Sequence, residues 1–330
     1  SWTAGRCRFI RKFCSQPRLI DTPAMPETVL TKISEMPIDS LTGLSNPYVP
    51  SSELRYSPKL ILHRDYDTDI DPVTFEVIRH ALWNINEEHG ATIQRVSGSP
   101  VAMYALDLNP TIMTEDAEFV YVGPYMQYMS GVADTQVKWI LEYRSDNPGI
   151  SDGDMFLSND PWVGAPHQQD VMLICPVFWE GELFAWITNC LHQYDIGGAT
   201  PGSFCPAAES SFDEGICLPP VKIIEGFEIR RDIEEVYLRS SRKPEMVALD
   251  FRAQMVGNSS ARQRLLDLIQ RYGSATVKGV MKKIIADSET SYLEKMARLP
   301  DGVWQDRTYV ECCRPGDRQT YRVILTIRKK

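Results

Sequence analysis

Two histidines and an aspartate stand where two apolar runs of the chain come together. His167 precedes the run Val171–Phe178, Asp170 opens that run, and His192 ends the run Leu183–Leu191. Two imidazoles and one carboxylate can occupy one face of a divalent ion and leave its other positions open for substrate or water. The residue types therefore predict a manganese, iron or zinc site at His167, Asp170 and His192.

A second interpretation of the same residues needs no metal. His167 lies in a segment broken by two prolines and a glycine, so it belongs to a loop and can simply face solvent. Asp170 then only starts a strand, and His192 only ends one. The sequence contains no Cys-x-x-Cys pair that would offer a competing zinc site.

A β-hairpin is the element that must position these side chains. Both apolar runs have the length and the β-branched content of strands, and Glu180-Gly181 fits a two-residue turn in which glycine accepts a positive φ. With that turn Asp170 would face Leu191, whereas a three-residue turn would place it opposite His192. In either register, Asp170 and His192 lie at the open end of the hairpin.

Three further polar residues are candidates for catalysis. Asp195 follows His192 by three residues and either orients that imidazole, acts as a base, or makes a turn. Asn159 and Asp160 precede Pro161 and either line a pocket or form an Asx turn. Residue type and spacing leave these interpretations open.

The composition narrows the class of protein. The first twenty residues hold five basic residues and no acid, so the other 310 carry 30 basic and 44 acidic residues, a net charge of −14. An acidic body of this kind excludes nucleic acid as an expected partner. No apolar run reaches eighteen residues, so no membrane span is expected. The cysteine spacing suits no disulfide framework, which predicts a reducing compartment, the cytoplasm.

The remaining pattern predicts an α+β fold with mixed or antiparallel sheets and helices that flank the hairpin. The N-terminal residues 1–65 are expected to form an irregular arm, either non-native or a targeting segment, and the chain is expected to be truncated at its C-terminus. His80 and His89 fall on or near the first helix and are expected to be partly exposed. One expected helix begins at Asp71-Pro72. The other expected helices cover Gln127–Tyr143, Arg230–Arg239, Pro244–Arg271 and Ser274–Leu299. The expected further strands are Val101–Leu108, Glu118–Val122, Val221–Ile224, Thr308–Cys312 and Tyr321–Ile327.

The chain resembles the hydantoinase B/oxoprolinase family, which includes the metal-binding alpha subunit of acetone carboxylase and related acetophenone carboxylase subunits. The resemblance starts near Asp71, with DPVTFEVIRHAL, and is densest over GDMFLSNDPWVGAPHQQD, PVFWEGEL, LHQYDIGGATPGS and EGICLPPVKI. It implies that residues 66–330 form a hydantoinase B-like catalytic domain and leaves residues 1–65 outside.

The resemblance also implies cofactors and partners. Such subunits work with a hydantoinase A-like subunit that binds ATP and phosphorylates a carbonyl substrate, so a hetero-oligomer is expected. The His-x-x-Asp and following His of the carboxylase metal site, which holds manganese in the acetone enzyme, fall on His167, Asp170 and His192. This chain has no P-loop, in agreement with ATP binding by a partner.

One departure from the family pattern concerns the fourth metal ligand. Family members usually carry an acid shortly before the strand expected at Val101–Leu108, but Arg95–Met103 contains none, and Asp107 is the nearest carboxylate. Three functions remain: ATP-dependent carboxylation of a ketone, with the ion as a Lewis acid; ATP-dependent hydrolysis of a cyclic amide, a hydantoin or 5-oxoproline; and an inactive scaffold subunit. The quoted motifs do not separate them.

Overall fold

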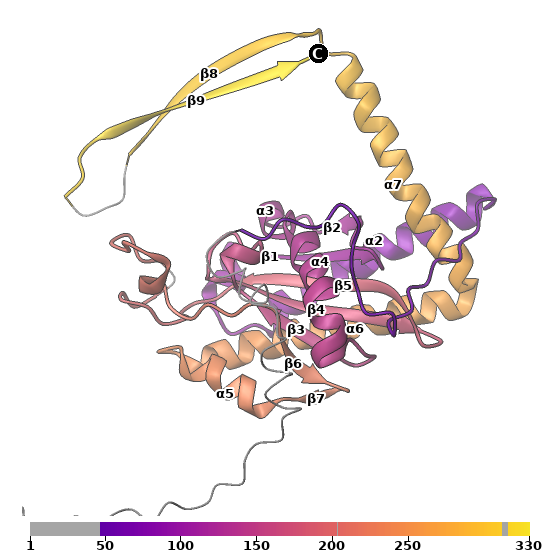
Figure 1. The fold of residues 1–330 in the computed structure, drawn as a ribbon, viewed down its shortest axis with the longest axis horizontal. Helices are drawn as coiled ribbons and strands as arrows, with labels where there is room; N and C mark the ends of the chain where they lie inside the picture. The colour runs from indigo at the N-terminus through magenta and orange to yellow at the C-terminus, as the bar shows by residue number, and fades with distance from the viewer. Residues whose placement is uncertain (1–46, 203, 312–315) are drawn as a thin grey trace, which may run out of the picture. The chain divides into compact units, whose positions relative to one another are not determined.

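An antiparallel sheet of seven strands forms the centre of the protein, in the order β2-β1-β5-β4-β3-β6-β7 (Figure 1). Its strands are β1 Leu108–Thr114, β2 Phe119–Val122, β3 Met155–Ser158, β4 Asp170–Trp179, β5 Glu182–His192, β6 Val221–Glu225 and β7 Glu228–Ile229. The computed structural model describes residues 47–202, 204–311 and 316–330, which all belong to one unit. The α+β class with an antiparallel sheet is confirmed.

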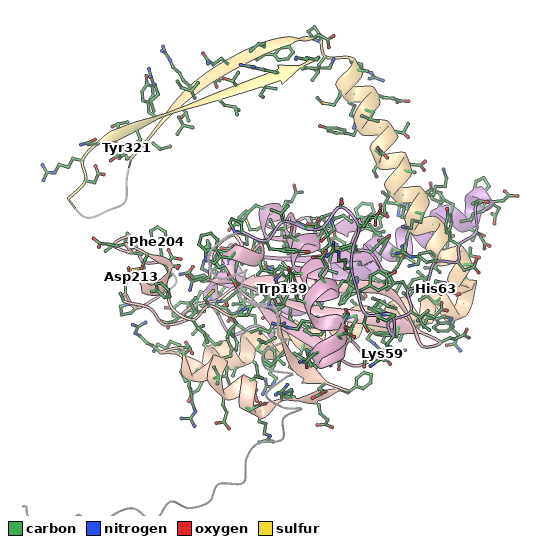
Figure 2. All side chains as sticks on the ribbon, in the orientation of Figure 1. Lys59, His63, Trp139, Phe204, Asp213 and Tyr321 are labelled. Carbon is green, nitrogen blue, oxygen red and sulfur yellow. The ribbon has the colours of Figure 1, made fainter. Side chains whose placement is uncertain are left out.

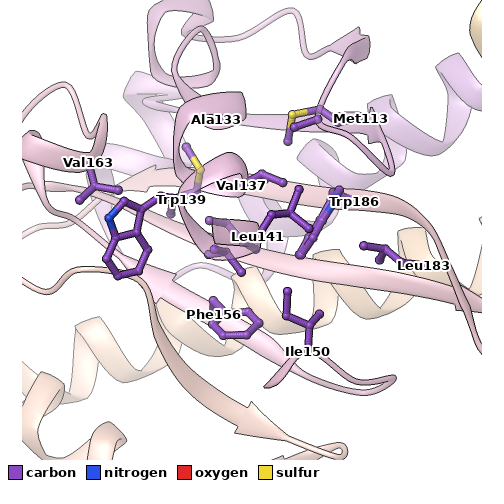
Figure 3. Close-up of a cluster of buried hydrophobic side chains, with 14 of the residues drawn as sticks. Met113, Ala133, Val137, Trp139, Leu141, Ile150, Phe156, Val163, Leu183 and Trp186 are labelled. Atoms are coloured by element: carbon purple, nitrogen blue, oxygen red, sulfur yellow. The ribbon is translucent and has the colours of Figure 1, made fainter. Parts of the chain in front are cut away.

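Helices cover both faces of this sheet. They are α2 Pro72–Val96, α3 Gln127–Ser130, α4 Ala133–Arg144, α5 Arg231–Arg239, α6 Pro244–Tyr272 and α7 Ser274–Ala297. Alternate residues of each strand point to opposite faces, so Met172 and Trp186 pack against α4, while Leu173 and Ile187 pack on the side of α2 and α6. Figure 3 shows the cluster on the α4 side, where Trp186 lies among the side chains of that helix.

The helix starts follow local signals that the sequence carries. Asp71 caps α2 by accepting from the N–H groups of Val73 and Thr74, and Pro72 occupies the first helical position. Gly273, which has a φ of 87°, separates α6 from α7. These starts and the helices over residues 231–239, 244–272 and 274–297 agree with the sequence prediction.

The β4–β5 hairpin has the expected two-residue turn and an unexpected bulge. Glu180 and Gly181 have φ values of 50° and 86°, and Trp179 pairs with Glu182 across them. One residue later the ladder shifts, because β5 carries one extra residue, Phe184, between its partners of Val177 and Phe178. The shift persists to the open end of the hairpin and sets the pairing there.

Two predicted elements are wrong in detail. The strand expected at Val101–Leu108 is a π-helical turn over Val101–Ala105, and β1 begins only at Leu108. The cause is distant in sequence: Asp250 of α6, which is buried, accepts from the Ser97 hydroxyl and the Gly98 N–H and so fixes the chain after α2 in a turn. The helix expected over 127–143 is two helices, α3 and α4, which are separated at residues 131–132.

His89 is also not the partly exposed residue that the sequence suggests. Its side chain is 1% exposed, its Nε2 lies 3.1 Å from the Asn189 amide nitrogen, and burial lowers its pKa to about 3. The close approach of α6 to α2 explains this burial, because a Cβ at Gly257 would stand 2.7 Å from the His89 ring.

The described part of the N-terminal arm, residues 47–65, contains no helix or strand but packs against the sheet. Leu60 and Leu62 are buried in the α4-side core, and the His63 N–H donates to the Leu183 carbonyl at 3.0 Å, beside the hairpin (Figure 2). Residues 1–46 lie outside the described residues.

At the other end, β8 Gly302–Glu311 and β9 Thr320–Lys329 pair as a two-stranded antiparallel sheet. The end of the strand expected at Thr308–Cys312 falls outside the described residues. None of the helices in the described ranges has a stretch that is both long and apolar enough to span a bilayer.

Candidate metal centre

Three adjacent strands bring Asp107, His192 and Asp170 into one row on the α4 side of the sheet. Asp170 pairs directly with His192 across β4 and β5. The His192 N–H donates to the Asp107 carbonyl at 3.0 Å, which continues the β1–β5 ladder by one residue beyond the pair of Leu108 and Leu191. Because directly paired residues of antiparallel strands point to the same face, the three side chains share that face.

His167 joins this row from the loop before β4. Its carbonyl accepts from the Asp170 N–H at 3.1 Å, and its Nε2 lies 3.6 Å from Asp170 Oδ2. The rings of His167 and His192 meet edge to face, with centroids 5.0 Å apart. Ligand atoms of His167, Asp170 and His192 all lie within 4.8 Å of one another, a spacing compatible with a shared cation. The structure thus brings together the three residues predicted as metal ligands.

Several buried polar atoms of this cluster lack hydrogen-bond partners within the described residues. Asp170 is fully buried, yet neither of its carboxylate oxygens has a hydrogen bond within the described residues. The Nδ1 atoms of His167 and His192 are buried and unpaired as well. A buried carboxylate without a partner costs several kcal/mol, so this donor set fits a divalent cation between the carboxylate and the imidazoles.

The pKa values in the cluster shift in the direction that burial dictates. Burial and, after it, the charge of Asp107 raise the pKa of Asp170 to about 8. Burial and the neighbouring His192 lower the pKa of His167, and burial lowers that of His192. Both imidazoles are therefore neutral at pH 7, which is the state that binds metal. Within the described ranges, no lysine or arginine contributes to these shifts.

Asn159 holds the loop that carries His167. Its amide nitrogen donates to the carbonyls of Gln168 and Ile216 at 2.6 and 2.8 Å, and its oxygen accepts from the Leu218 N–H at 2.7 Å. The Gln168 side chain adds a bond to the Gly215 carbonyl at 3.0 Å. These contacts support a positioning role for Asn159, predicted as a catalytic candidate.

The other two catalytic candidates stabilise turns. Asp160 accepts from the Trp162 N–H at 2.9 Å and caps the short helix Pro161–Val163. Asp195 accepts from the N–H groups of Gly197, Gly202 and Arg242 at 2.9 to 3.0 Å, and it lies outside the metal cluster. Burial opposes its ionisation, but these bonds and the Arg242 charge keep the pKa of Asp195 below its ordinary value.

Sequence reasoning missed two neighbours of the cluster. Asp107 was only the nearest acid in sequence, and the structure places it in the row beside His192. Tyr128 received no functional interpretation, yet the charges of Asp170 and Asp107 act on its phenol. The strand predicted over 101–108 placed Asp107 inside a strand and gave it no role. The single helix predicted over 127–143 likewise gave Tyr128 no place beside the sheet.

Comparison with known proteins finds relatives that are named as enzymes or as enzyme subunits. The acetophenone carboxylase delta subunit of Aromatoleum aromaticum is 29% identical over 280 residues, which cover 84% of this chain and 40% of the relative. The caprolactamase subunit beta of Pseudomonas jessenii is 28% identical over 243 residues, 73% of this chain and 41% of the relative. The 5-oxoprolinase of Dictyostelium discoideum is 29% identical over 222 residues, 67% of this chain and 17% of the relative. The chain thus spans less than half the length of these relatives.

Two solved structures share the fold. Nucleotide-free acetone carboxylase superposes with a TM-score of 0.69 at 22% identity, over 78% of this chain and 35% of that chain. The ATP-dependent caprolactamase of Pseudomonas jessenii superposes with a TM-score of 0.69 at 27% identity, over 73% of this chain and 42% of that chain. The model of the family described as hydantoinase B/oxoprolinase matches residues 71–330. This chain belongs to the hydantoinase B/oxoprolinase family.

Proposed function

We propose that this chain is the metal-binding catalytic subunit of an ATP-dependent enzyme that acts on a carbonyl compound, with ketone carboxylation as the first candidate reaction. The buried, unpaired carboxylate of Asp170 between two neutral histidines carries the proposal. The acetophenone carboxylase subunit, similar over 84% of the chain, supports the choice of a ketone.

The residues that would hold the ion are His167, Asp170 and His192, with Asp107 as the candidate for a fourth ligand. When bound, a divalent ion supplies a Lewis acid that polarises a carbonyl oxygen. Manganese is the first choice, with zinc and iron as alternatives, because a set of two imidazoles and one or two carboxylates accepts all three. Two ionised carboxylates would balance the charge of such an ion, since both imidazoles are neutral.

The partner in this proposal is a hydantoinase A-like subunit that binds ATP, in a hetero-oligomer. The names of two relatives describe subunits, and the caprolactamase structure is described as ATP-dependent. We also propose a cytoplasmic location, which the four free cysteines of the described residues support.

Hydrolysis of a cyclic amide is the second candidate reaction. Its support is the caprolactamase of known structure, which shares 27% of its residues with this chain at a TM-score of 0.69. A lactam and a ketone each present a carbonyl group to the same ligands, so the metal cluster serves either reaction.

The decisive experiment measures metal content and then substrate dependence. Purified chain is analysed for bound manganese, zinc and iron, beside His167→Ala and His192→Ala variants. We expect about one ion per chain in the wild type and a loss in both variants; no ion in the wild type, and no stability change in the variants, would support the inactive scaffold instead. With the ATP-binding partner present, bicarbonate-dependent consumption of acetophenone supports carboxylation, whereas amino-acid release from caprolactam supports hydrolysis.

A further inference from the structure

Tyr128 lies on an element that β1 fixes beside the candidate metal centre. The Met126 N–H, just before α3, donates to the Leu108 carbonyl at 3.1 Å. The Ser130 hydroxyl, at the other end of α3, donates to the Asn109 carbonyl at 3.4 Å. Tyr128 is therefore held between two anchors over the end of β1 that adjoins the row of ligands.

The phenol of Tyr128 lies within the electrostatic reach of this row. Burial, followed by the charges of Asp170 and Asp107 and by Cys190, raises the pKa of Tyr128 to about 12. Cys190 stands two residues before His192 on the same face of β5. Met129, the next residue of α3, belongs to the same buried cluster as Cys190, so α3 packs on the face of the sheet that carries the row of ligands.

The hydroxyl of Tyr128 is available for a ligand. The side chain is 52% exposed, whereas Met129 and Ser130 of the same helix are buried, so α3 is anchored while the phenol reaches solvent. Among the residues that the structure describes, none forms a hydrogen bond with this hydroxyl. A phenol keeps its proton at neutral pH and can donate one hydrogen bond.

We propose that the Tyr128 hydroxyl donates a hydrogen bond to the carbonyl oxygen of the substrate at the candidate metal centre. The inference rests on the proposed function, because it needs a metal-dependent reaction of a carbonyl compound. It is common to the two candidate reactions, since ketones and lactams both carry a carbonyl oxygen. The Tyr128 hydroxyl would be a hydrogen-bond donor beside metal ligands that only accept. It would therefore favour a substrate with an acceptor atom, such as a carbonyl oxygen, at this position.

The test compares Tyr128→Phe with Tyr104→Phe. Tyr104 is 80% exposed, precedes the row by only three residues in sequence and has its hydroxyl in solvent, so its variant controls for loss of a nearby phenol. Each chain is loaded with Mn²⁺, its metal content is measured, and acetohydroxamate, a small carbonyl ligand that binds divalent ions, is titrated while the Mn²⁺ electron paramagnetic resonance is followed. We expect equal metal content in all three chains and acetohydroxamate binding about fivefold to tenfold weaker in Tyr128→Phe alone.

The possible outcomes distinguish a failure of the role of Tyr128 from a failure of the proposed metal-dependent function. Full metal content with unchanged acetohydroxamate affinity in Tyr128→Phe overturns the role of Tyr128 and leaves the metal centre intact. Loss of metal in Tyr128→Phe also overturns it, because the residue would then support the ion itself. A wild type that binds no Mn²⁺ overturns the metal centre and the role of Tyr128 together.

Discussion

Replacing Asp170 with asparagine should stabilise the metal-free protein at neutral pH, although Asp170 is at the centre of the candidate site. In the folded chain the pKa of Asp170 is raised from 3.8 to about 8, chiefly by burial. A carboxyl group with a raised pKa binds more protons in the folded state than in the unfolded state, so its contribution makes stability fall as pH rises from about 4 to about 8.

The magnitude follows from the size of this pKa shift. A pH of 7 is roughly three pH units above the pKa of Asp170 in the unfolded chain. Each of these units lowers the free energy of unfolding by about 1.4 kcal/mol, so the ionisable carboxyl group destabilises the fold by about 4 kcal/mol at most. Asparagine avoids this cost but leaves an unpaired amide, which costs about 1 to 3 kcal/mol. The net gain for metal-free Asp170→Asn at pH 7 is about 1 to 3 kcal/mol, and it vanishes near pH 5.

Urea unfolding of chelator-treated protein between pH 5 and pH 8 checks this expectation, with the exposed Asp65→Asn variant as a control for loss of one charge. Added Mn²⁺ at a hundred times its dissociation constant should stabilise the wild type by about 2.7 kcal/mol and leave Asp170→Asn unchanged. Equal pH slopes for metal-free wild type and Asp170→Asn would refute the assigned burial of an unpaired carboxyl group.

Four further substitutions test contacts in the site and in the fold that supports it. Asn159→Ala removes the three hydrogen bonds of a buried side chain, so we expect a loss of about 3 kcal/mol in urea unfolding and weaker metal binding; unchanged metal affinity would contradict its positioning role. Gly181→Ala should cost about 1 kcal/mol, because its φ is 86° but nothing lies within 4 Å of a Cβ there. Gly215→Ala should cost more in the same assay, because its Cβ would stand 2.5 Å from the Ile196 carbonyl oxygen; a smaller loss than for Gly181→Ala would show that the chain yields there. Lys278→Met should cost about 3 kcal/mol, because the buried Glu115 then keeps the half-exposed Arg64 as its charged partner, and Lys278→Met with Glu115→Leu should recover most of it; a double variant as unstable as the single one would count against the ion pair.

The sequence predicted the hairpin well, because its apolar runs and its acidic-glycine turn are local signals. It could not choose the register, since the bulge at Phe184 has no local signature. The Phe184 carbonyl accepts from the buried ammonium of Lys278, almost a hundred residues later. Contacts between residues so far apart in sequence form only in the assembled fold, and no periodic pattern in the sequence predicts them.

The same limit applies to the site. The types and spacing of His167, Asp170 and His192 were sufficient to predict their meeting, which the structure bears out in geometry. Asp107 and Asn159 acquire their positions from long-range contacts: Asp107 from the ladder with β5, and Asn159 from main-chain groups nearly sixty residues later. Residue type identified Asn159 as notable but could not assign its partners.

The bulge at Phe184 makes the number of residues in β5 a determinant of the site. Side chains alternate along a strand with a period of two, so a ladder that paired Phe184 with Val177, without the bulge, would put Leu191 in place of His192 opposite Asp170. The bulge lies about eight residues, roughly 26 Å of strand, from that pair. Surface turns usually tolerate insertions and deletions, but one residue inserted or deleted in β5 between Ala185 and His192 would turn His192 to the other face of the sheet while Ala185 stayed paired with Val177. A change in the number of residues in this strand would therefore remove His192 from the row of ligands, although no ligand had been substituted.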